Sequence, residues 1–339
     1  SQKHLVSKSD GRVICLRHFF ALNHHDSKRG KDLTGKFFCC PVRNLFLWIG
    51  KFFPDPDQSV RKSVAAQCLA HSSRSLVGTS RHKHRAELLD GSRNVVFCAV
   101  DMKKDEIRAL EEAYAKAECP VVSNNSAHRF TPDVPMVIPE INDAHLEVIP
   151  AQRTRLGTKN GFVAVKSNCS LQSYVPALHP LMEFGLNKAL VCTYQAISGA
   201  GKTFATWPEM VDNVIPYIGG EEEKSEQEPL KIWGKVEDGK IVPVSSPSIT
   251  AQCIRVPVSD GHLAACFMSF DKKPSIEQIK KKWATYSGAP QALNLPSAPK
   301  QFLHYFEEPD RPQTKSERNL ENGMAVSIGR LREDTQSDY

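Results

Sequence analysis

The feature that most constrains this fold is a regular alternation of strand-like and helix-like segments that begins near residue 92. Residues 94–100 form an apolar run typical of a buried strand, and residues 119–123 form a second one. Between them, residues 103–118 place their apolar side chains at helical spacing. A strand, a helix and a strand in this order predict a βαβ unit, which implies a parallel sheet. This part of the chain is therefore expected to be an α/β domain.

The segments that follow extend this pattern and then change its character. Strands at 134–138 and 161–166, with a helix at 144–156, are expected to complete the parallel sheet. After residue 188, we expect strands at 189–194, 240–244, 251–258, 262–270 and 325–331, and a helix at 275–286. This second region is predicted to be α+β, with a largely antiparallel sheet. The acidic run at 221–228 fits a plain solvated surface.

The first 92 residues lack a sustained period, and only residues 59–69 fit a short helix. Residues 1–90 carry a surplus of 9 positive charges. No recognisable nucleic-acid motif accompanies this charge, so a solvated or poorly structured segment without a nucleic-acid partner is expected. The longest apolar stretch contains Arg43 and Lys51, which argue against a membrane span.

The composition is that of a globular protein, with 339 residues, 40% hydrophobic and 24% charged, and it suits about two domains. The ten cysteines have no regular spacing, and the polar residues 1–10 do not resemble a secretory signal. A cytoplasmic protein with reduced thiols is therefore expected. The adjacent Cys39 and Cys40 lack the spacing of a zinc site, and no metal is expected.

The strongest chemical signal is Cys169, in the Ser-Asn-Cys-Ser stretch at residues 167–170. It stands between the strand at 161–166 and an amphipathic run at 171–185, which predicts a cysteine in the first turn of a helix. Backbone N–H groups and the helix dipole favour an anion there, so the thiol could act as a nucleophile. The alternative is a buried structural cysteine.

Four further motifs accompany this cysteine. A glycine-rich turn closes residues 195–201, and residues 218–224 bring carboxylates and an ammonium together. Residues 253–262 place an arginine and a histidine on either side of an Asp-Gly turn, and residues 123–129 lead from a strand end to an arginine. Each motif taken singly is compatible with an ordinary surface ion pair or turn.

Together, these ordered motifs resemble aspartate-semialdehyde dehydrogenase of the type found in archaea, fungi and some bacteria. The resemblance runs from about Asn94 to the end of the chain. It implies a divergent basic region at 1–92, the remainder of a partial Rossmann-like dinucleotide-binding domain at 93–166, and a catalytic and dimerisation domain at 167–339. The family converts L-aspartate 4-semialdehyde, phosphate and NADP to aspartyl phosphate and NADPH, in lysine, threonine and methionine biosynthesis. It works as a homodimer or a tetramer.

The resemblance also implies roles for single residues. Cys169 would attack the aldehyde, His262 would act as general base and acid, and Gln195 would orient the substrate. Arg255 matches the residue that grips the substrate carboxylate, and Glu221 matches the partner of the substrate amino group. Because Glu222 is adjacent, the resemblance leaves open which of the two glutamates takes this role.

The remaining matched residues would bind phosphate and cofactor. Lys224 and Arg129 match the phosphate ligands, which require positive charge, and we expect them to lie near each other. Ser198 and Gly199 match the turn that meets the cofactor. The expected cofactor is NADP, with NAD as the alternative, because the segment that would decide between them is divergent.

The chain departs from the family pattern at both ends. Residues 1–92 lack the Gly-x-x-Gly-x-x-Gly turn that seats a pyrophosphate, and only residues 69–74 faintly resemble the segment that meets the adenosine. The chain stops at Tyr339, before the family's final helix. We therefore expect weak or absent cofactor binding, even with an intact catalytic group.

Three hypotheses accommodate these departures. The chain is a working enzyme with a diverged beginning, an inactive member that keeps the dimerisation fold and binds a partner, or an incomplete or wrongly spliced product. The irregular first 92 residues favour the second and third, because a nucleotide-binding half needs long periodic segments.

Overall fold

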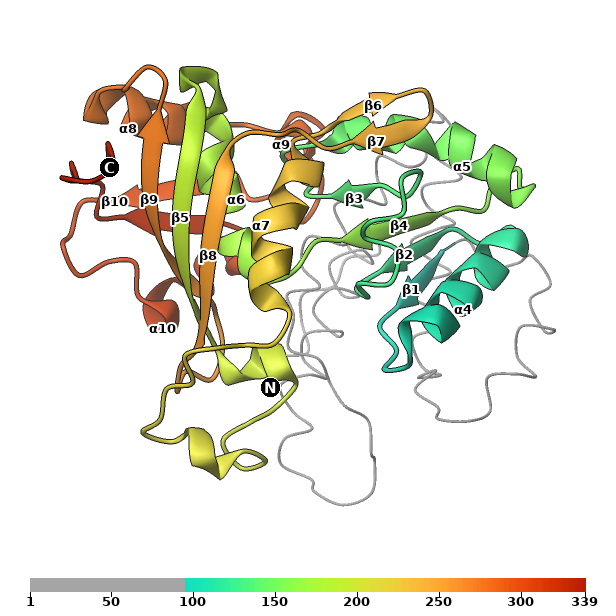
Figure 1. Ribbon diagram of the computed structural model, residues 1–339, viewed down its shortest axis with the longest axis horizontal. Helices are drawn as coiled ribbons and strands as arrows, with labels where there is room; N and C mark the ends of the chain where they lie inside the picture. The colour runs from blue at the N-terminus through green and yellow to red at the C-terminus, as the bar shows by residue number, and fades with distance from the viewer. Residues whose placement is uncertain (1–94) are drawn as a thin grey trace, which may run out of the picture. The chain divides into compact units, whose positions relative to one another are not determined.

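The computed structural model describes residues 95–339 (Figure 1). The expectations for the basic region at 1–92, the short helix at 59–69 and the segment at 69–74 lie outside the described residues. Within residues 95–339, no helix is long and apolar enough to cross a membrane.

The first described part is a parallel four-stranded sheet, as predicted. Its strands are β1 (Val96–Cys98), β2 (Val121–Ser123), β3 (Met136–Val137) and β4 (Val163–Lys166). They run in the order β1-β2-β4-β3, and every neighbouring pair is parallel. Helix α4 (Lys104–Lys116) connects β1 to β2, which confirms the βαβ unit. The expected helix at 144–156 is a 3-10 turn, η5 (Asp143–Val148), followed by α5 (Ile149–Leu156).

The second sheet has β5 (Leu186–Gln195) at its centre, between β8 (Ser248–Arg255) and β9 (Leu263–Phe270). Strand β5 is parallel to β8 and antiparallel to β9, so the sheet is mixed. Two smaller pairs join β6 (Lys235–Glu237) to β7 (Lys240–Val242) and β10 (Leu303–Phe306) to β11 (Val326–Gly329).

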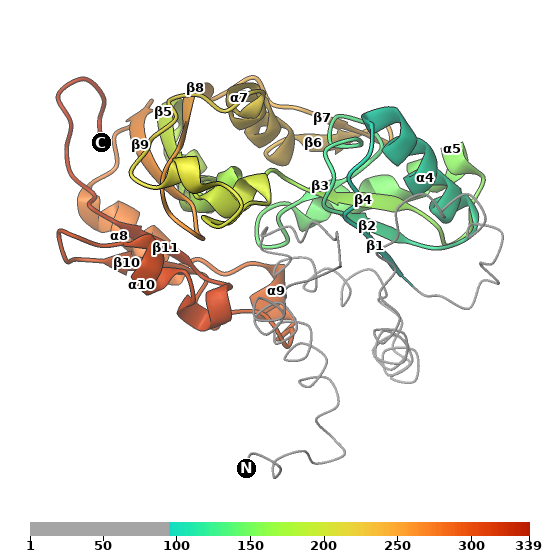
Figure 2. The same ribbon diagram turned by 90° about the horizontal axis from the view of Figure 1, so that it is seen from below.

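Parallel pairing has a larger share in this region than the sequence suggested, because β10 and β11 are also parallel. The long connection from β5 to β8 contains α7 (Glu221–Ile232), and a parallel pair requires such a crossover. In the view of Figure 1 the β10–β11 pair lies behind the three-stranded sheet, and Figure 2 shows it as a separate layer.

Two helical expectations need correction. The acidic run at 221–228 is not plain surface, because it forms most of α7, whose side chains Ser225 and Glu228 are buried. The amphipathic run at 171–185 is not one helix. It breaks into η6 (Ser170–Ser173), α6 (Val175–Leu178) and η7 (His179–Phe184). Pro176 and Pro180 lack the N–H that a continuous helix would use, so each begins a new short segment.

The remaining helices cover the second region. They are α8 (Ile276–Thr285), α9 (Ala289–Ala292) and α10 (Thr314–Glu317), with 3-10 turns η8 (Ile197–Ala200), η9 (Pro208–Met210) and η10 (Leu320–Gly323). Ser275 is the N-cap of α8, and its hydroxyl accepts the Gln278 N–H. Its buried Ile279 and Trp283 join a core cluster that also includes Val165 of the first sheet and Val191 of the second. The two sheets therefore share one hydrophobic core.

Candidate active site

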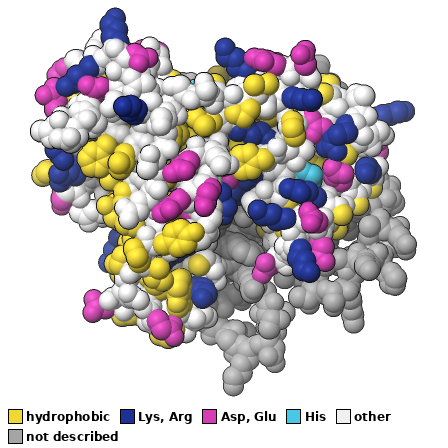
Figure 3. Space-filling view, viewed as in Figure 1, with side chains coloured by type: hydrophobic (Ala, Val, Ile, Leu, Met, Phe, Trp, Pro, Cys, Tyr) yellow, Lys and Arg dark blue, Asp and Glu magenta, His cyan; other side chains and the backbone are white. Residues whose placement is uncertain are grey.

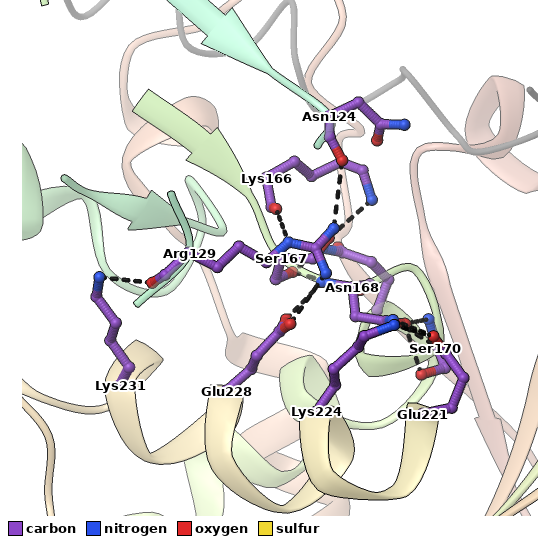
Figure 4. Close-up of polar contacts among 11 residues, drawn as sticks. Asn124, Arg129, Lys166, Ser167, Asn168, Ser170, Glu221, Lys224, Glu228 and Lys231 are labelled. Atoms are coloured by element: carbon purple, nitrogen blue, oxygen red, sulfur yellow. Dashed lines mark hydrogen bonds and ion pairs between the residues drawn. The ribbon is translucent and has the colours of Figure 1, made fainter. Parts of the chain in front are cut away.

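The turn that carries Cys169 is fixed by the side chain and backbone of Asn168 (Figure 4). The backbone N–H of Asn168 donates to Glu228 Oε2 at 2.7 Å, and its side-chain amide donates to both oxygens of Glu221, at 3.0 and 2.9 Å. Its Oδ1 accepts from the N–H and the hydroxyl of Ser170, at 2.9 and 2.8 Å. Both carboxylates come from α7, so this helix sets the path of the chain on either side of Cys169.

Cys169 is half-buried and carries a reduced thiol. It stands at the N-cap of η6, a 3-10 helix of four residues. The dipole of a long helix, which the sequence led us to expect at Cys169, is therefore absent there. Arg255 interacts electrostatically with the Cys169 thiol. Burial lowers the pKa of Arg255, and the charges of Glu221 and Cys169 oppose that shift.

The ends of β5 and β8 bring two predicted residues together. Gln195 and Arg255 are direct partners in the parallel register, and both are buried. Gln195 Nε2 donates to Thr193 Oγ1 at 3.2 Å, and Arg255 Nη1 donates to the carbonyl of Ala196 at 2.7 Å. The carboxyl ends of these strands therefore present an amide and a guanidinium side by side.

His262 and Gly199 join this group from the two turns that follow. The N–H of Ala196 donates to His262 Nδ1 at 3.1 Å, so the neutral ring carries its proton on Nε2. A Cβ built on Gly199 would lie 2.9 Å from Arg255 Nη1 and 3.0 Å from His262 Cε1. The neighbouring Ser198 is buried. The glycine thus allows the Ser198–Gly199 backbone to approach the arginine and the histidine closely.

The two predicted phosphate ligands both engage carboxylates of α7 (Figure 4). Arg129 Nη1 donates to Glu228 Oε1 at 2.9 Å, and Lys224 Nζ donates to Glu221 Oε1 at 2.7 Å. Arg129 is only 6% exposed, so it is not part of an ordinary surface ion pair. Its guanidinium also donates to the carbonyl of Lys166 at 2.9 Å. Phosphate binding by Arg129 and Lys224 stays a prediction.

Sequence reasoning missed three residues that build this site: Asn168, Glu228 and Lys231. The buried Lys231 ammonium donates to three backbone carbonyls of the loop after β2, those of Arg129, Thr131 and Val134, at 2.6, 2.9 and 3.0 Å. A signal for Glu228 was present, because it lies one turn from Lys224 and two turns from Glu221 on one helical face.

The described residues suit one end of a dinucleotide. Strands β1, β2 and β4 are parallel and end at Cys98, Ser123 and Lys166, and dinucleotides bind at the carboxyl ends of such strands. Within residues 95–339, no group of three or more His, Cys, Asp or Glu side chains is arranged to hold a metal ion.

Comparison with known proteins agrees with this architecture. The family described as "Semialdehyde dehydrogenase, NAD binding domain" matches residues 65–149, and "Semialdehyde dehydrogenase, dimerisation domain" matches residues 178–339. The first match begins before Asn94, where the resemblance was expected to start, and it includes residues 69–74. Fold and site therefore define a semialdehyde dehydrogenase, an oxidoreductase with a dinucleotide-binding part and a dimerisation part.

Individual relatives narrow the assignment. The aspartate-semialdehyde dehydrogenase of Archaeoglobus fulgidus is 40% identical over 241 residues, which cover 71% of this chain and 68% of the relative. That of Saccharomyces cerevisiae is 39% identical over 259 residues, which cover 73% and 70%. The crystal structure of aspartate-semialdehyde dehydrogenase with NADP from Candida albicans matches with a TM-score of 0.65 and 37% identity, over 73% of this chain and 70% of that chain. The chain belongs to the aspartate-semialdehyde dehydrogenase family, and it is an enzyme of amino-acid biosynthesis.

Proposed function

We propose that this chain catalyses the reversible conversion of L-aspartate 4-semialdehyde, phosphate and NADP to aspartyl phosphate and NADPH, on the route to lysine, threonine and methionine. The observation that supports this proposal is the convergence of Gln195, Arg255 and His262 with the turn that carries Cys169. The cytoplasm would be its compartment.

The nucleophile of the proposed reaction is the Cys169 thiolate. The positive charge of Arg255 favours this anion, because an opposite charge nearby stabilises the ionised form. Attack on the aldehyde carbon forms a carbon–sulfur bond and leaves a thiohemiacetal. The planar fork of Arg255 also suits the substrate carboxylate, and Glu221 suits its ammonium group.

His262 would serve as the general acid and base of the first step. In the structure its Nδ1 accepts the N–H of Ala196, so the neutral ring offers Nε2–H as a hydrogen-bond donor to the substrate oxygen, and Nε2 would accept a proton only after the ring proton has moved to Nδ1. Gln195 is the register partner of Arg255, so it would hold the reacting carbonyl next to the substrate carboxylate that Arg255 binds. When bound, NADP supplies a hydride acceptor, and removal of the hydride leaves a thioester on Cys169.

Phosphate would then attack the thioester carbon, and the carbon–sulfur bond breaks to release aspartyl phosphate and the thiolate. Arg129 and Lys224 are the cations proposed to hold this phosphate. Lys224 is bonded to Glu221 here, so an incoming substrate ammonium would compete for the same carboxylate. That competition would release Lys224 toward the phosphate.

The enzyme is proposed to work as a homodimer or a tetramer of dimers. Leu190 of β5 and Phe267 of β9 are direct cross-strand partners and are 50% and 38% exposed. Figure 3 shows hydrophobic side chains gathered over this sheet and over the segment that follows β5, where Val211, Val214 and Tyr217 are exposed. An apolar sheet face of this kind suits a subunit interface.

The test is NADPH formation by the purified full chain with L-aspartate 4-semialdehyde and phosphate, in parallel with the C169A variant. The proposal predicts activity in the wild type and its loss, by about 10³-fold or more, in C169A. If the wild type forms dimers but no NADPH at any cofactor concentration, the chain is an inactive family member that binds a partner, and the proposed reaction is wrong.

A further inference from the structure

Glu228 is a fully buried carboxylate whose two oxygens are used by two different segments of the chain. Oε1 accepts from Arg129 Nη1 at 2.9 Å, and Oε2 accepts from the backbone N–H of Asn168 at 2.7 Å. Asn168 directly precedes Cys169, and Arg129 is the predicted phosphate ligand. The Glu228 carboxylate therefore lies between the turn that carries Cys169 and the predicted phosphate ligand Arg129 (Figure 4). Glu228 itself is not proposed to bind the substrate.

The partners of Glu228 are themselves tied to the ends of the parallel sheet. Arg129 donates to the carbonyl of Lys166 at the end of β4 at 2.9 Å, and to the carbonyl of Asn124 just after β2 at 3.3 Å. Glu228 thus connects α7 to the carboxyl edge where the substrate and the cofactor are expected to meet. A buried ion pair is a weak source of net stability but fixes geometry strongly, since both groups need their hydrogen bonds.

From this arrangement, and resting on the proposed function, we propose that Glu228 is a positioning residue. Its carboxylate holds the Asn168–Cys169 backbone and the Arg129 guanidinium in one fixed relation, so that phosphate on Arg129 meets the thioester on Cys169. An amide cannot replace it. A glutamine side chain has one accepting oxygen, and its NH₂ would face either the Arg129 or the Asn168 N–H.

The first experiment compares E228Q with the matched variant E226Q, which carries the same substitution on the same helix. Glu226 Oε1 accepts the N–H of Ala251 at 3.1 Å, a backbone contact away from the nucleophile turn. We expect kcat to fall about 10- to 100-fold in E228Q, because a misplaced reacting group can cost that much. The KM for the semialdehyde should stay within about threefold, since Arg255 is untouched. E226Q should match the wild type in both values.

A second measurement separates positioning from loss of folded protein. The pH dependence of Cys169 alkylation by iodoacetamide, followed by mass spectrometry, reports the thiolate. Removing a buried negative charge and leaving Arg129 without its partner favour the anion, so the alkylation midpoint in E228Q should move to lower pH. More thiolate with slower turnover is the signature of positioning. Partial unfolding would leave the midpoint of the folded fraction unmoved.

The double variant R129Q/E228Q keeps the test decisive if E228Q does not fold, because it removes the charges of both partners of the ion pair at once. We expect its alkylation midpoint to return toward that of the wild type while phosphate-dependent turnover stays low. Equal kcat values for E228Q and E226Q, or a double variant whose alkylation differs from the wild type as strongly as E228Q does, would overturn the proposal. A wild type without dehydrogenase activity, but with the same alkylation shift in E228Q, would refute the proposed reaction and show that Glu228 still acts on the Cys169 turn.

Discussion

Glu140 follows β3 and offers a sharp test of how burial controls the stability of this fold. Its side chain is 3% exposed, and neither carboxylate oxygen has a hydrogen-bond partner in the part of the chain that the structure describes. Burial raises the pKa of Glu140 from 4.5 to about 8, because an uncompensated charge is costly in an apolar setting. The perturbation is E140Q, which removes the titration and keeps the shape.

The sign follows from proton binding in the two states. Between pH 4.5 and about 8 the folded state holds a proton on Glu140 that the unfolded state has released. The free energy of unfolding is therefore highest below pH 4.5 and declines as the pH rises to about 8. Integrated over this shift, the contribution lost between about pH 5 and about pH 8 is of order 3 kcal/mol.

The assay is urea denaturation followed by tryptophan fluorescence, on the wild type, E140Q and the exposed control E147Q, across that pH range. The stability of E140Q relative to the wild type should rise by about 3 kcal/mol as the pH increases. E147Q should follow the wild type at every pH. If the curves of E140Q and the wild type run parallel from acid to alkaline pH, the buried carboxyl is not protonated in the folded protein, and the reasoning is wrong.

Three further outcomes are expected. Cys169 should react with iodoacetamide faster than any other cysteine of the folded chain at neutral pH, because Arg255 stabilises its thiolate; mass spectrometry identifies the labelled residue, and first labelling elsewhere contradicts the nucleophile assignment. Gly199→Ala should lower turnover about tenfold or more, with little change in Tm, because the added methyl would meet Arg255 Nη1 at 2.9 Å and His262 Cε1 at 3.0 Å. Lys231→Met should cost about 2–4 kcal/mol in urea denaturation, because three buried carbonyls lose their donor; a cost below about 1 kcal/mol would mean that the loop repacks.

The parts of the fold that the sequence predicted correctly are those where local pattern and burial agree. The strand–helix–strand order of residues 94–123 was predictable because β2 is fully buried and α4 has one apolar face, which buries Ile107 and Ala115. Strand β10 was missed because its four residues, Leu303–Phe306, are too short a run to show a strand period, whereas the longer alternating run at 325–331 predicted its partner β11. The run at 171–185 kept a helical period although two prolines interrupt its hydrogen bonds.

The site shows the same division between local and distant information. Ordered motifs predicted Gln195, Arg255, His262 and Gly199, and the structure places these four in contact or in register. For Cys169, the predicted helix is only the four-residue turn η6, whereas Arg255, which the motifs also predicted, interacts electrostatically with the thiol. The pairing of β5 with β8, through a long crossover, places Arg255 beside Gln195, and a local pattern carries no information about that register.

Helix α7 shows how a very polar stretch of the second region forms a helix with one buried face. Glu221, Lys224 and Glu228 recur at one-turn spacing, so a helix presents all three to the Asn168–Cys169 turn at once. Neither a strand nor a loop would align groups at this spacing on one face. The cost of burying Glu228 and Lys231 is offset by an arginine, a backbone N–H and three carbonyls that need partners of their own. A run that reads as solvated surface is therefore better understood as one rigid element that carries a proposed ammonium ligand, a proposed phosphate ligand and the carboxylate that aligns them.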